Sequence, residues 1–388
     1  MESDKKMKKK VHVLLVLDYI NSNSGVSSVV MNYYNHINKA KVQMDFLLYE
    51  EPEKTTLDYL QEKGSRVYSF GHPVKTGLGK YRKLIKNFFK EHVGEYQIVH
   101  LHIPNAAFIV LKYAKKYGIV TRILHSHNTR GADEMVKKVR NYMLNRYGIS
   151  YATHYFACSK LSGEYLYGKK QTDKITVINN ATQLDKFRYS SQTRKKIRES
   201  LAISDEQLVL GHVGRFSKQK NHEFLIEIAK KLKEKQVDFK LLLLGGGELQ
   251  ESMKEQVRLY NLEEQVVFAG VVTNPNEYMD AMDLFLLPSN YEGLPCVCIE
   301  AQANGLPCMI SANVTREAAI SNFVSFYEIS DVDIWVKEIL EKYNHNQAEL
   351  HRGEVPAGLE AYDILVQAKK LEEKYLVYGE ASDPNVNL

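Results

Sequence analysis

Two glutamates that stand eight positions apart, Glu292 and Glu300, flank the predicted start of a helix. The apolar run 284–287 is typical of a buried strand, Pro288 ends it, and residues 297–303 are good helix formers. Backbone N–H groups at a helix start favour anions, so this stretch can combine carboxylates with an anion-binding main chain. The alternative is one exposed glutamate at a helix start and another on a helix surface.

A basic pair follows an apolar run in the middle of the chain. Residues 208–214 predict a strand that ends in glycine, and Arg215 and Lys220 stand in the loop after it. We expect Asn221 to cap the next helix. Cations at the end of a strand and beside a helix start suit a phosphate group. The alternative is an ordinary solvated basic loop.

Glycine-containing loops follow two other predicted strands. The strand 11–17 leads into a polar loop with Gly25 and then a helix, which is a Rossmann-like opening. The G-x-G-x-x-G pattern is absent, so dinucleotide binding is not indicated. After the strand 241–244, Gly245 and Gly247 permit a close approach of the backbone to a ligand.

Two His-x-His pairs, in residues 99–102 and 122–127, end predicted strands. Alternate strand residues face the same way, so each pair can present two imidazoles together. A zinc site is one interpretation, but no cysteine or carboxylate lies at ligand spacing. Polar residues at strand ends, where open α/β sheets place their sites, are the other. Asp331 and Asp333 form an acidic pair that suits a helix cap better than a metal.

The charge of the chain is unevenly distributed. The net charge is +5, but residues 1–200 carry 35 basic and 17 acidic side chains, and residues 201–388 carry 17 and 30. This division predicts two domains with different partners. The four cysteines lack disulfide-rich or zinc spacing, which fits a reducing compartment. No apolar run approaches the length of a membrane span.

These motifs resemble the retaining nucleotide-sugar glycosyltransferases of family 4. The family places two glutamates eight positions apart within Pro-Ser, Gly-Leu-Pro and Glu-Ala-x-Ala-x-Gly, as residues 288–305 do here. The resemblance implies an α/β fold of two Rossmann-like domains that face each other across a cleft, the GT-B arrangement. We expect the domains at 1–187 and 188–360, with the charged, apolar-poor stretch 188–206 as the connector. The resemblance implies in 361–388 a last helix that crosses back to the first domain.

The resemblance also implies roles for individual residues. Glu300 would bind the ribose and Glu292 the donor sugar, while Arg215 and Lys220 would stabilise the leaving diphosphate in place of a metal ion. The acceptor would lie near His127. The remaining donor-site residues implied by the resemblance are Gly25, Gly214, Gly245, Gly247, Val272, Gly293 and Leu294. No cofactor and no bound metal are expected.

The implied reaction is metal-independent transfer of a hexosyl or N-acetylhexosaminyl group, with retention of configuration. The donor would be a UDP-sugar and the acceptor a glycan or a lipid-linked glycan of the cell surface, such as a capsule or an exopolysaccharide. The alternatives are a nucleotide-sugar epimerase, a phosphorylase, or a partner subunit without catalytic activity. Absence of a pyridoxal-phosphate lysine motif disfavours a phosphorylase, and the four charged residues at 215, 220, 292 and 300 disfavour a subunit without chemistry.

The excess of positive charge in the first 200 residues suggests a further partner. One basic group surrounds Phe88 and Phe89, and a second lies in residues 137–146. The members are Lys80, Arg82, Lys83, Lys86 and Lys90 in the first group, and Lys137, Lys138, Arg140 and Arg146 in the second. We hypothesise a cytoplasmic protein that docks on the anionic inner face of the membrane, with the two phenylalanines inserted. The alternative is that both pack inside the domain. No nucleic-acid motif accompanies the charge.

Overall fold

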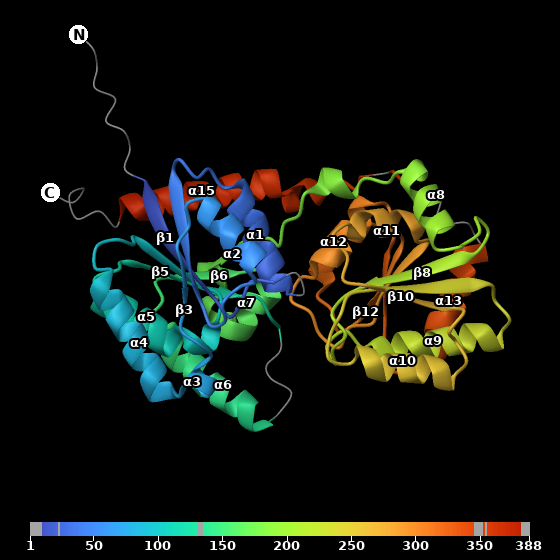
Figure 1. Ribbon diagram of the computed structural model, residues 1–388, viewed down its shortest axis with the longest axis horizontal. Coiled ribbons are helices and arrows are strands. Elements are labelled where there is room, and N and C mark those ends of the chain that lie inside the picture. The colour runs from blue at the N-terminus through green and yellow to red at the C-terminus, as the bar shows by residue number, and fades with distance from the viewer. Residues whose placement is uncertain (1–9, 22–23, 130–134, 345–351, 354, 382–388) are drawn as a thin grey trace, which may run out of the picture. The chain divides into compact units, whose positions relative to one another are not determined.

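The computed structural model describes residues 10–21, 24–129, 135–344, 352–353 and 355–381 (Figure 1). Its contacts divide the chain into two compact units. The first contains residues 1–21, 26–179 and 365–388, and the second contains residues 22–25 and 180–364. The chain therefore has two α/β domains, each built on one parallel sheet. The unit boundaries fall at 179/180 and 364/365, whereas the bounds expected from the sequence were 187/188 and 360/361.

The first unit is a seven-stranded parallel sheet in the order β3-β2-β1-β4-β5-β6-β7. Its strands are β1 (Val11–Leu17), β2 (Val42–Leu48), β3 (Val67–Ser69), β4 (Ile98–Leu101), β5 (Thr121–Ser126), β6 (His154–Ala157) and β7 (Ile175–Val177). Its helices are α1 (Gly25–His36), α2 (Lys54–Glu62), α3 (Pro73–Thr76), α4 (Leu78–Glu91), α5 (Ala107–Lys116), α6 (Met135–Ile149), α7 (Lys160–Tyr167) and α15 (Ile364–Glu380). Alternation of strand and helix produces the parallel pairing that the sequence predicted.

The second unit is a six-stranded parallel sheet in the order β10-β9-β8-β11-β12-β13. Its strands are β8 (Leu208–Val213), β9 (Phe239–Leu244), β10 (Val266–Gly270), β11 (Leu284–Leu287), β12 (Cys308–Ser311) and β13 (Val324–Tyr327). Its helices are α8 (Ser191–Ser200), α9 (His222–Glu234), α10 (Gln250–Leu259), α11 (Pro275–Ala281), α12 (Cys296–Ala303) and α13 (Val332–Asn344). Short 3-10 turns lie at 184–187, 316–318 and 359–362 in this unit, and at 104–106 and 169–174 in the first unit.

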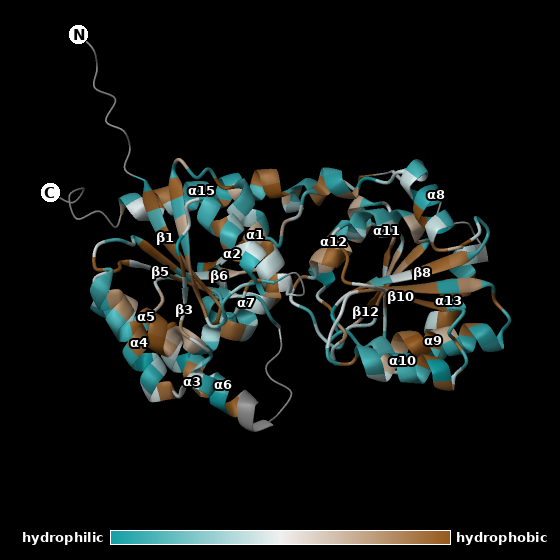
Figure 2. Ribbon diagram, viewed as in Figure 1, coloured by the Kyte–Doolittle hydropathy of each residue, from teal (hydrophilic) through white to brown (hydrophobic). Residues whose placement is uncertain are grey.

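Each sheet forms the centre of its own hydrophobic core. Figure 2 shows apolar strands inside each unit and hydrophilic residues on the outward helix surfaces. Helices cover both faces of a doubly wound sheet, so its strands are apolar on both sides. In the first unit Leu14 and Val99 are fully buried, and in the second Leu243 and Trp335 are. Among the described residues, no helix combines the length and apolarity needed to cross a bilayer.

The apolar face of α4 packs inside the first unit. Phe88 and Phe89 are 2% and 1% exposed and belong to the core with Leu14. The hypothesis that these phenylalanines insert into a membrane is therefore wrong. Their spacing on α4 is the ordinary spacing of a helix face that packs on a sheet. The side chains of Lys137 and Lys138, in the second basic group, lie outside the described residues.

The stretch predicted as a connector, 188–206, contains a helix that is fixed to the second unit. In α8, Arg194 and Arg198 each donate from Nη2 to Asp283, at 2.6 Å to Oδ1 and Oδ2. Asp283 Oδ2 also accepts from the backbone of Val209 at 2.7 Å. A carboxylate shared by two arginines and a main-chain amide anchors α8 beside the start of β8, which the charge-rich sequence did not reveal.

The last helix belongs to the first unit, as predicted. In α15, Glu372 accepts from Lys41 Nζ at 2.8 Å and from the backbone of Asn38 at 3.0 Å. Asp331 precedes α13 (Val332–Asn344) and caps it, because Asp331 Oδ1 accepts from the backbone of Asp333 at 2.9 Å. That contact agrees with the interpretation of the pair as a helix start.

Candidate active site

The second unit changes direction between β8 and β11, which are adjacent in the sheet. The chain continues from β8 through β9 to one edge and from β11 through β12 to the other. Loops after two such strands diverge and leave room for a ligand at the carboxyl edge of the sheet. The basic pair follows β8 and the first glutamate follows β11, so the fold places both predicted motifs at this switch point.

An ion pair joins the two motifs. Lys220 Nζ lies 2.8 Å from Glu292 Oε1, and the two side chains are 16% and 10% exposed. Gln219 Nε2 donates to Glu292 Oε2 at 3.2 Å. A largely desolvated cation and carboxylate in this position are each held in one place before a ligand arrives.

Hydrogen bonds between the loop after β8 and the loop after β11 hold this ion pair. Asn290 donates from its backbone to Gln219 O at 2.8 Å, and Asn221 Nδ2 donates to Pro288 O at 3.1 Å. Asn221 precedes α9 in a left-handed conformation, but no side-chain cap bond forms. Its amide links the two loops instead, which corrects the expectation of a cap.

The residues after Glu292 are buried at the start of α12. Leu294 is 3% exposed, and its carbonyl accepts from Asn180 Nδ2 at 2.6 Å. Gly293 is buried beside it. The stretch from Glu292 to Leu294 thus lies directly before the N-terminal turn of α12, with its backbone fixed.

The predicted glycine loop lies against the loop after β8. Gly245 and Gly247 have φ values of +132° and +155°. A Cβ on Gly247 would meet Phe216 O at 2.5 Å, and one on Gly245 would collide with Gly214 O. Phe216 donates from its backbone to Gly246 O at 3.0 Å. The two loops can lie in contact only because these positions lack side chains.

Three further predicted residues, Arg215, Val272 and Gly25, make no described hydrogen bond or ion pair with Lys220 or Glu292. Arg215 is in the same loop as Lys220, but its side chain is 43% exposed and its Nε lies 3.9 Å from Glu248 Oε2. Val272 is half-buried just after β10. Gly25 is the first residue of α1, and apart from its chain neighbours and its own helix backbone no described atom lies within 4 Å of the place where its Cβ would project. The structure therefore gathers the basic loop, the glycine loop and Val272 at one sheet edge, and Gly25 at a helix start.

Glu300 lies within α12 and keeps part of its surface exposed. Thr182 Oγ1 donates to its Oε1 at 3.2 Å. Protein atoms surround the carboxyl, and this burial raises its pKa to about 7, against the opposing effects of Thr182 and Lys186. The carboxyl can therefore take or release a proton near neutral pH, a property that spacing alone does not predict.

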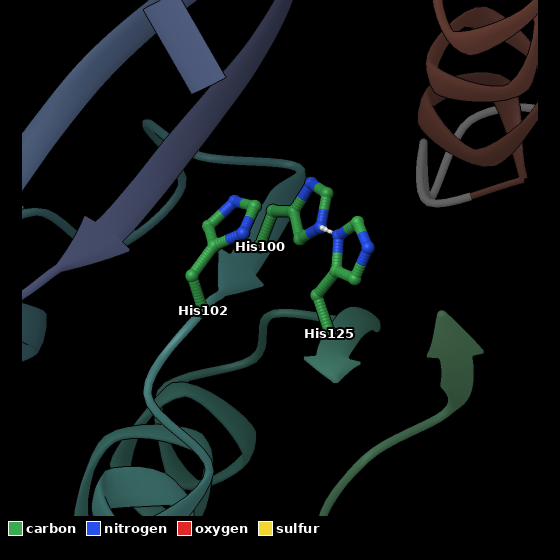
Figure 3. Close-up of side chains that lie close together, drawn as sticks. All are labelled: His100, His102 and His125. Carbon is green, nitrogen blue, oxygen red and sulfur yellow. Dashed lines mark hydrogen bonds between the residues drawn. The ribbon is translucent and has the colours of Figure 1, made fainter. Parts of the chain in front are cut away.

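The two His-x-His pairs meet at the carboxyl ends of β4 and β5 in the first unit. His100 Nε2 lies 3.0 Å from His125 Nδ1, and His102 Nδ1 lies 2.8 Å from His127 Nε2. The other nitrogen of His100 lies 2.6 Å from Tyr375 Oη of α15. Figure 3 shows three of these rings side by side, with the bond between His100 and His125. As alternation predicts, the two rings of each pair lie together, with ring centroids 4.2 Å apart for His100 and His102 and 4.1 Å apart for His125 and His127.

These imidazoles stay neutral at ordinary pH. Burial lowers the pKa of His127 to about 4 and that of His100 to about 3. The rings of His100, His102 and His125 each place one nitrogen within 4.8 Å of the others, so they are a candidate metal cluster. However, both nitrogens of His100 already have partners, so a metal would have to break its bond to His125 or to Tyr375. The arrangement is a hydrogen-bonded set of rings.

Sequence reasoning missed three contributors to these sites. Thr182, Gln219 and Tyr375 contact Glu300, Glu292 and His100 respectively. Thr182 and Tyr375 are far in sequence from their partners, and no local pattern marks them. Gln219 is adjacent to Lys220, and a polar residue beside the predicted phosphate ligand was the available signal.

Comparison with known families assigns both halves of the chain. Residues 23–186 match the model named Glycosyltransferase Family 4, and residues 193–352 match the model named Glycosyl transferases group 1. EpsF of Bacillus subtilis (strain 168), a candidate glycosyltransferase, is 32% identical over 84% of this chain and 86% of its own length. A UDP-Gal:alpha-D-GlcNAc-diphosphoundecaprenol alpha-1,3-galactosyltransferase of Escherichia coli is 24% identical over 91% and 94%.

The fold is shared with solved structures. HepE of Anabaena, in complex with UDP-glucose, aligns with a TM-score of 0.75 at 15% identity, over 94% of this chain and 98% of its own. At this identity the likeness concerns the architecture. It supports the two-domain α/β fold expected from the sequence.

The buried histidines predict an acid-labile first unit. Unfolded histidine takes a proton below pH 6.5, whereas His127 resists protonation down to about pH 4. Stability is therefore complete above pH 6.5 and falls as pH drops toward 4, by up to about 1.4 kcal/mol per pH unit for each such histidine. His127→Gln should reduce this slope in urea unfolding followed by circular dichroism.

Two controls make that measurement specific. The exposed His72, changed to Gln, should leave the slope as in the wild type. Trp335 is the chain's single tryptophan and lies in the second unit, so its fluorescence follows that unit separately. An unchanged slope for His127→Gln would contradict the assignment of a depressed pKa to His127.

Proposed function

Because this chain belongs to the glycosyltransferases of family 4, we propose that it transfers a sugar from a nucleotide-sugar donor to a glycan or lipid-linked acceptor, with retention of anomeric configuration. The observation that carries the proposal is the ion pair of Lys220 and Glu292 at the β8/β11 switch point. It brings a fixed cation and a fixed carboxylate to the edge where open α/β sheets bind ligands.

The proposed donor is a UDP-sugar, as in the complex of HepE with UDP-glucose. Glu300 accepts hydrogen bonds from the ribose hydroxyls, and Val272 lies by the base. Gly214, Gly245 and Gly247 let the backbone approach the diphosphate. Glu292, Gly293 and Leu294 form the site of the donor sugar at the start of α12, whose N–H groups favour an anion.

In the proposed reaction an acceptor hydroxyl attacks the anomeric carbon from the face that the diphosphate leaves. The bond from that carbon to the diphosphate oxygen breaks, and the leaving phosphate takes the acceptor proton. Lys220 and Arg215 stabilise the charge that grows on this phosphate, and such preorganised donors contribute a few kcal/mol each. The exposed side chain of Arg215 must turn from Glu248 to do so.

The proposed acceptor site lies in the first unit, near His127. His127 Nε2 is engaged by His102, so only Nδ1 is available to a substrate. The Escherichia coli relative is named for a diphosphoundecaprenol acceptor, which supports a lipid-linked substrate here. A product destined for a cell-surface polysaccharide follows from such an acceptor.

Lys220→Ala should lower turnover about a hundredfold to a thousandfold, because the charge on the leaving phosphate develops in the transition state. The measurement is release of UDP from a panel of UDP-sugars with acceptor present. Lys218→Ala is the matched control, since Lys218 is exposed in the same loop and should keep full turnover. Equal rates for Lys220→Ala and the wild type would exclude Lys220 from the reaction, and turnover of donor alone into an isomer would indicate an epimerase.

Transfer should survive an excess of EDTA, because two side-chain cations take the role of a divalent ion. The assay compares initial rates before and after chelation, and again after addition of Mg²⁺ or Mn²⁺. Loss of activity with EDTA and recovery with either ion would contradict metal independence and direct attention to Asp331 and Asp333.

The affinity for UDP-glucose should rise with pH and level off above about 7. Ribose hydroxyls that donate to Glu300 favour its ionised form, whereas the free carboxyl has a pKa of about 7, so binding at lower pH must release a proton. The expected slope approaches tenfold per pH unit below 7 in calorimetric titration. Glu300→Gln should flatten it, and the same slope in that variant would assign the proton to another group.

A further inference from the structure

A buried imidazole lies close to the loop that carries Lys220. His212 is the fifth residue of β8 and is fully buried. Its Nδ1 lies 2.8 Å from Leu286 O in β11. Because a carbonyl oxygen can only accept, Nδ1 carries the ring proton and Nε2 presents a bare lone pair. Burial lowers the pKa of His212 to about 3, so the ring stays neutral and the lone pair is retained at ordinary pH.

This lone pair lies in a fixed direction. The ring of His222 stands almost perpendicular to that of His212, with centroids 4.7 Å apart, and the ring of Phe285 lies parallel to it at 6.3 Å. Nε2 of His212 is buried, and among the described residues it has no hydrogen-bond partner. Buried polar atoms are nearly always hydrogen-bonded, so an acceptor held in this way indicates a donor that can move into reach.

Lys220 is the donor within reach. A Cβ on Gly214 would lie 2.7 Å from His212 Nε2 and 3.2 Å from Lys220 Cε. The two atoms are therefore no more than about 6 Å apart, and the glycine places no side chain between them. Nζ of Lys220 now lies 2.8 Å from Glu292 Oε1. Rotation about the last bonds of the lysine side chain moves Nζ toward His212 while the rest of the stem stays in place.

We propose that His212 is a positioning residue, whose Nε2 accepts from Lys220 once a nucleotide diphosphate occupies the switch point. An ammonium group has three N–H donors, of which Glu292 engages one in the free protein. With a diphosphate bound, one donor meets phosphate and another meets His212, so Nζ is held from two sides while charge grows on the leaving group. A neutral ring does this without offsetting the positive charge. The inference rests on the proposed role of Lys220 in sugar transfer.

A double-mutant cycle of His212 and Lys220 is the first test. His212→Met removes the acceptor and keeps an apolar side chain in the site, and it should lower turnover of a UDP-sugar about tenfold with little change in KM. In the Lys220→Ala background the same substitution should change turnover by less than about twofold, because His212 acts only through Lys220. His212→Gln keeps an acceptor and should recover part of the lost turnover.

The second test does not depend on activity. In the full chain labelled with ¹⁵N-histidine, addition of UDP should move the Nε2 signal of His212 upfield, since accepting a hydrogen bond shields a bare imidazole nitrogen. The signal is identified as the one that His212→Gln removes. Lys220→Ala should abolish the movement. His222→Gln is the matched control, because that ring is also buried but stacks on Phe216 at 3.9 Å, and it should leave the movement in place.

The outcomes separate this inference from the proposed function. Fluorescence of Trp335, in the same unit, should show that the His212 variants are folded. Equal losses from His212→Met in both backgrounds, or a signal that saturating UDP does not move, would overturn the positioning role and leave that of Lys220 intact. Wild-type turnover by Lys220→Ala would instead overturn the proposed role of Lys220, and the inference with it.

Discussion

The ion pair of Lys220 and Glu292 depends on the switch point of the second sheet. Only there, at the carboxyl edge of a doubly wound parallel sheet, do the loops after two adjacent strands run in opposite directions. The two residues follow β8 and β11, and they meet because those strands are neighbours. Removing a cation and a carboxylate from water costs several kcal/mol each, and their mutual attraction offsets this only with good geometry and further hydrogen bonds. Gln219 supplies one such bond. The ion pair therefore contributes little to the stability of the fold by itself. Its position at the ligand-binding edge of the sheet explains its presence better than stability does.

The glycines near this ion pair help to hold Lys220 at the switch point. The loops after β8 and β9 are stacked so closely that Gly214 O occupies the place of a Cβ on Gly245. A Cβ on Gly214 would in turn approach Lys220 Cδ to 3.1 Å. Close packing of two backbone segments leaves Lys220 little freedom to move away from the switch point. A basic residue that is long and flexible in isolation thus becomes a fixed charge.

Much of this arrangement could be predicted from the sequence. Apolar runs predicted the strands, and glycines and prolines marked where they end. The motif around Glu292 and Glu300 indicated the family. All of these are local patterns in the sequence. The anchoring of α8 could not be predicted, since Asp283 lies far along the chain from Arg194 and Arg198.

Which face of a helix is buried was harder to predict from the sequence than the strands or the anchoring of α8. The α4 and α6 helices are both basic and contain apolar residues, and periodicity shows that a helix has two faces without saying which face has a partner. Packing decides this: Phe88 is buried and Tyr142 is exposed. The raised pKa of Glu300 likewise depends on protein atoms brought around it by the fold.

The histidines show how a distant element can determine the state of a strand end. In a neutral imidazole one nitrogen donates and the other accepts. If Tyr375 donates to His100 Nδ1, then His100 Nε2 carries the proton and donates to His125 Nδ1; if Tyr375 accepts, both assignments reverse. One hydroxyl on α15 thereby sets the tautomers of two rings on neighbouring strands. The α15 helix therefore contributes to the hydrogen bonding of the first unit as well as to its packing. Without Tyr375, nothing would determine which nitrogen donates in the hydrogen bond between His100 and His125.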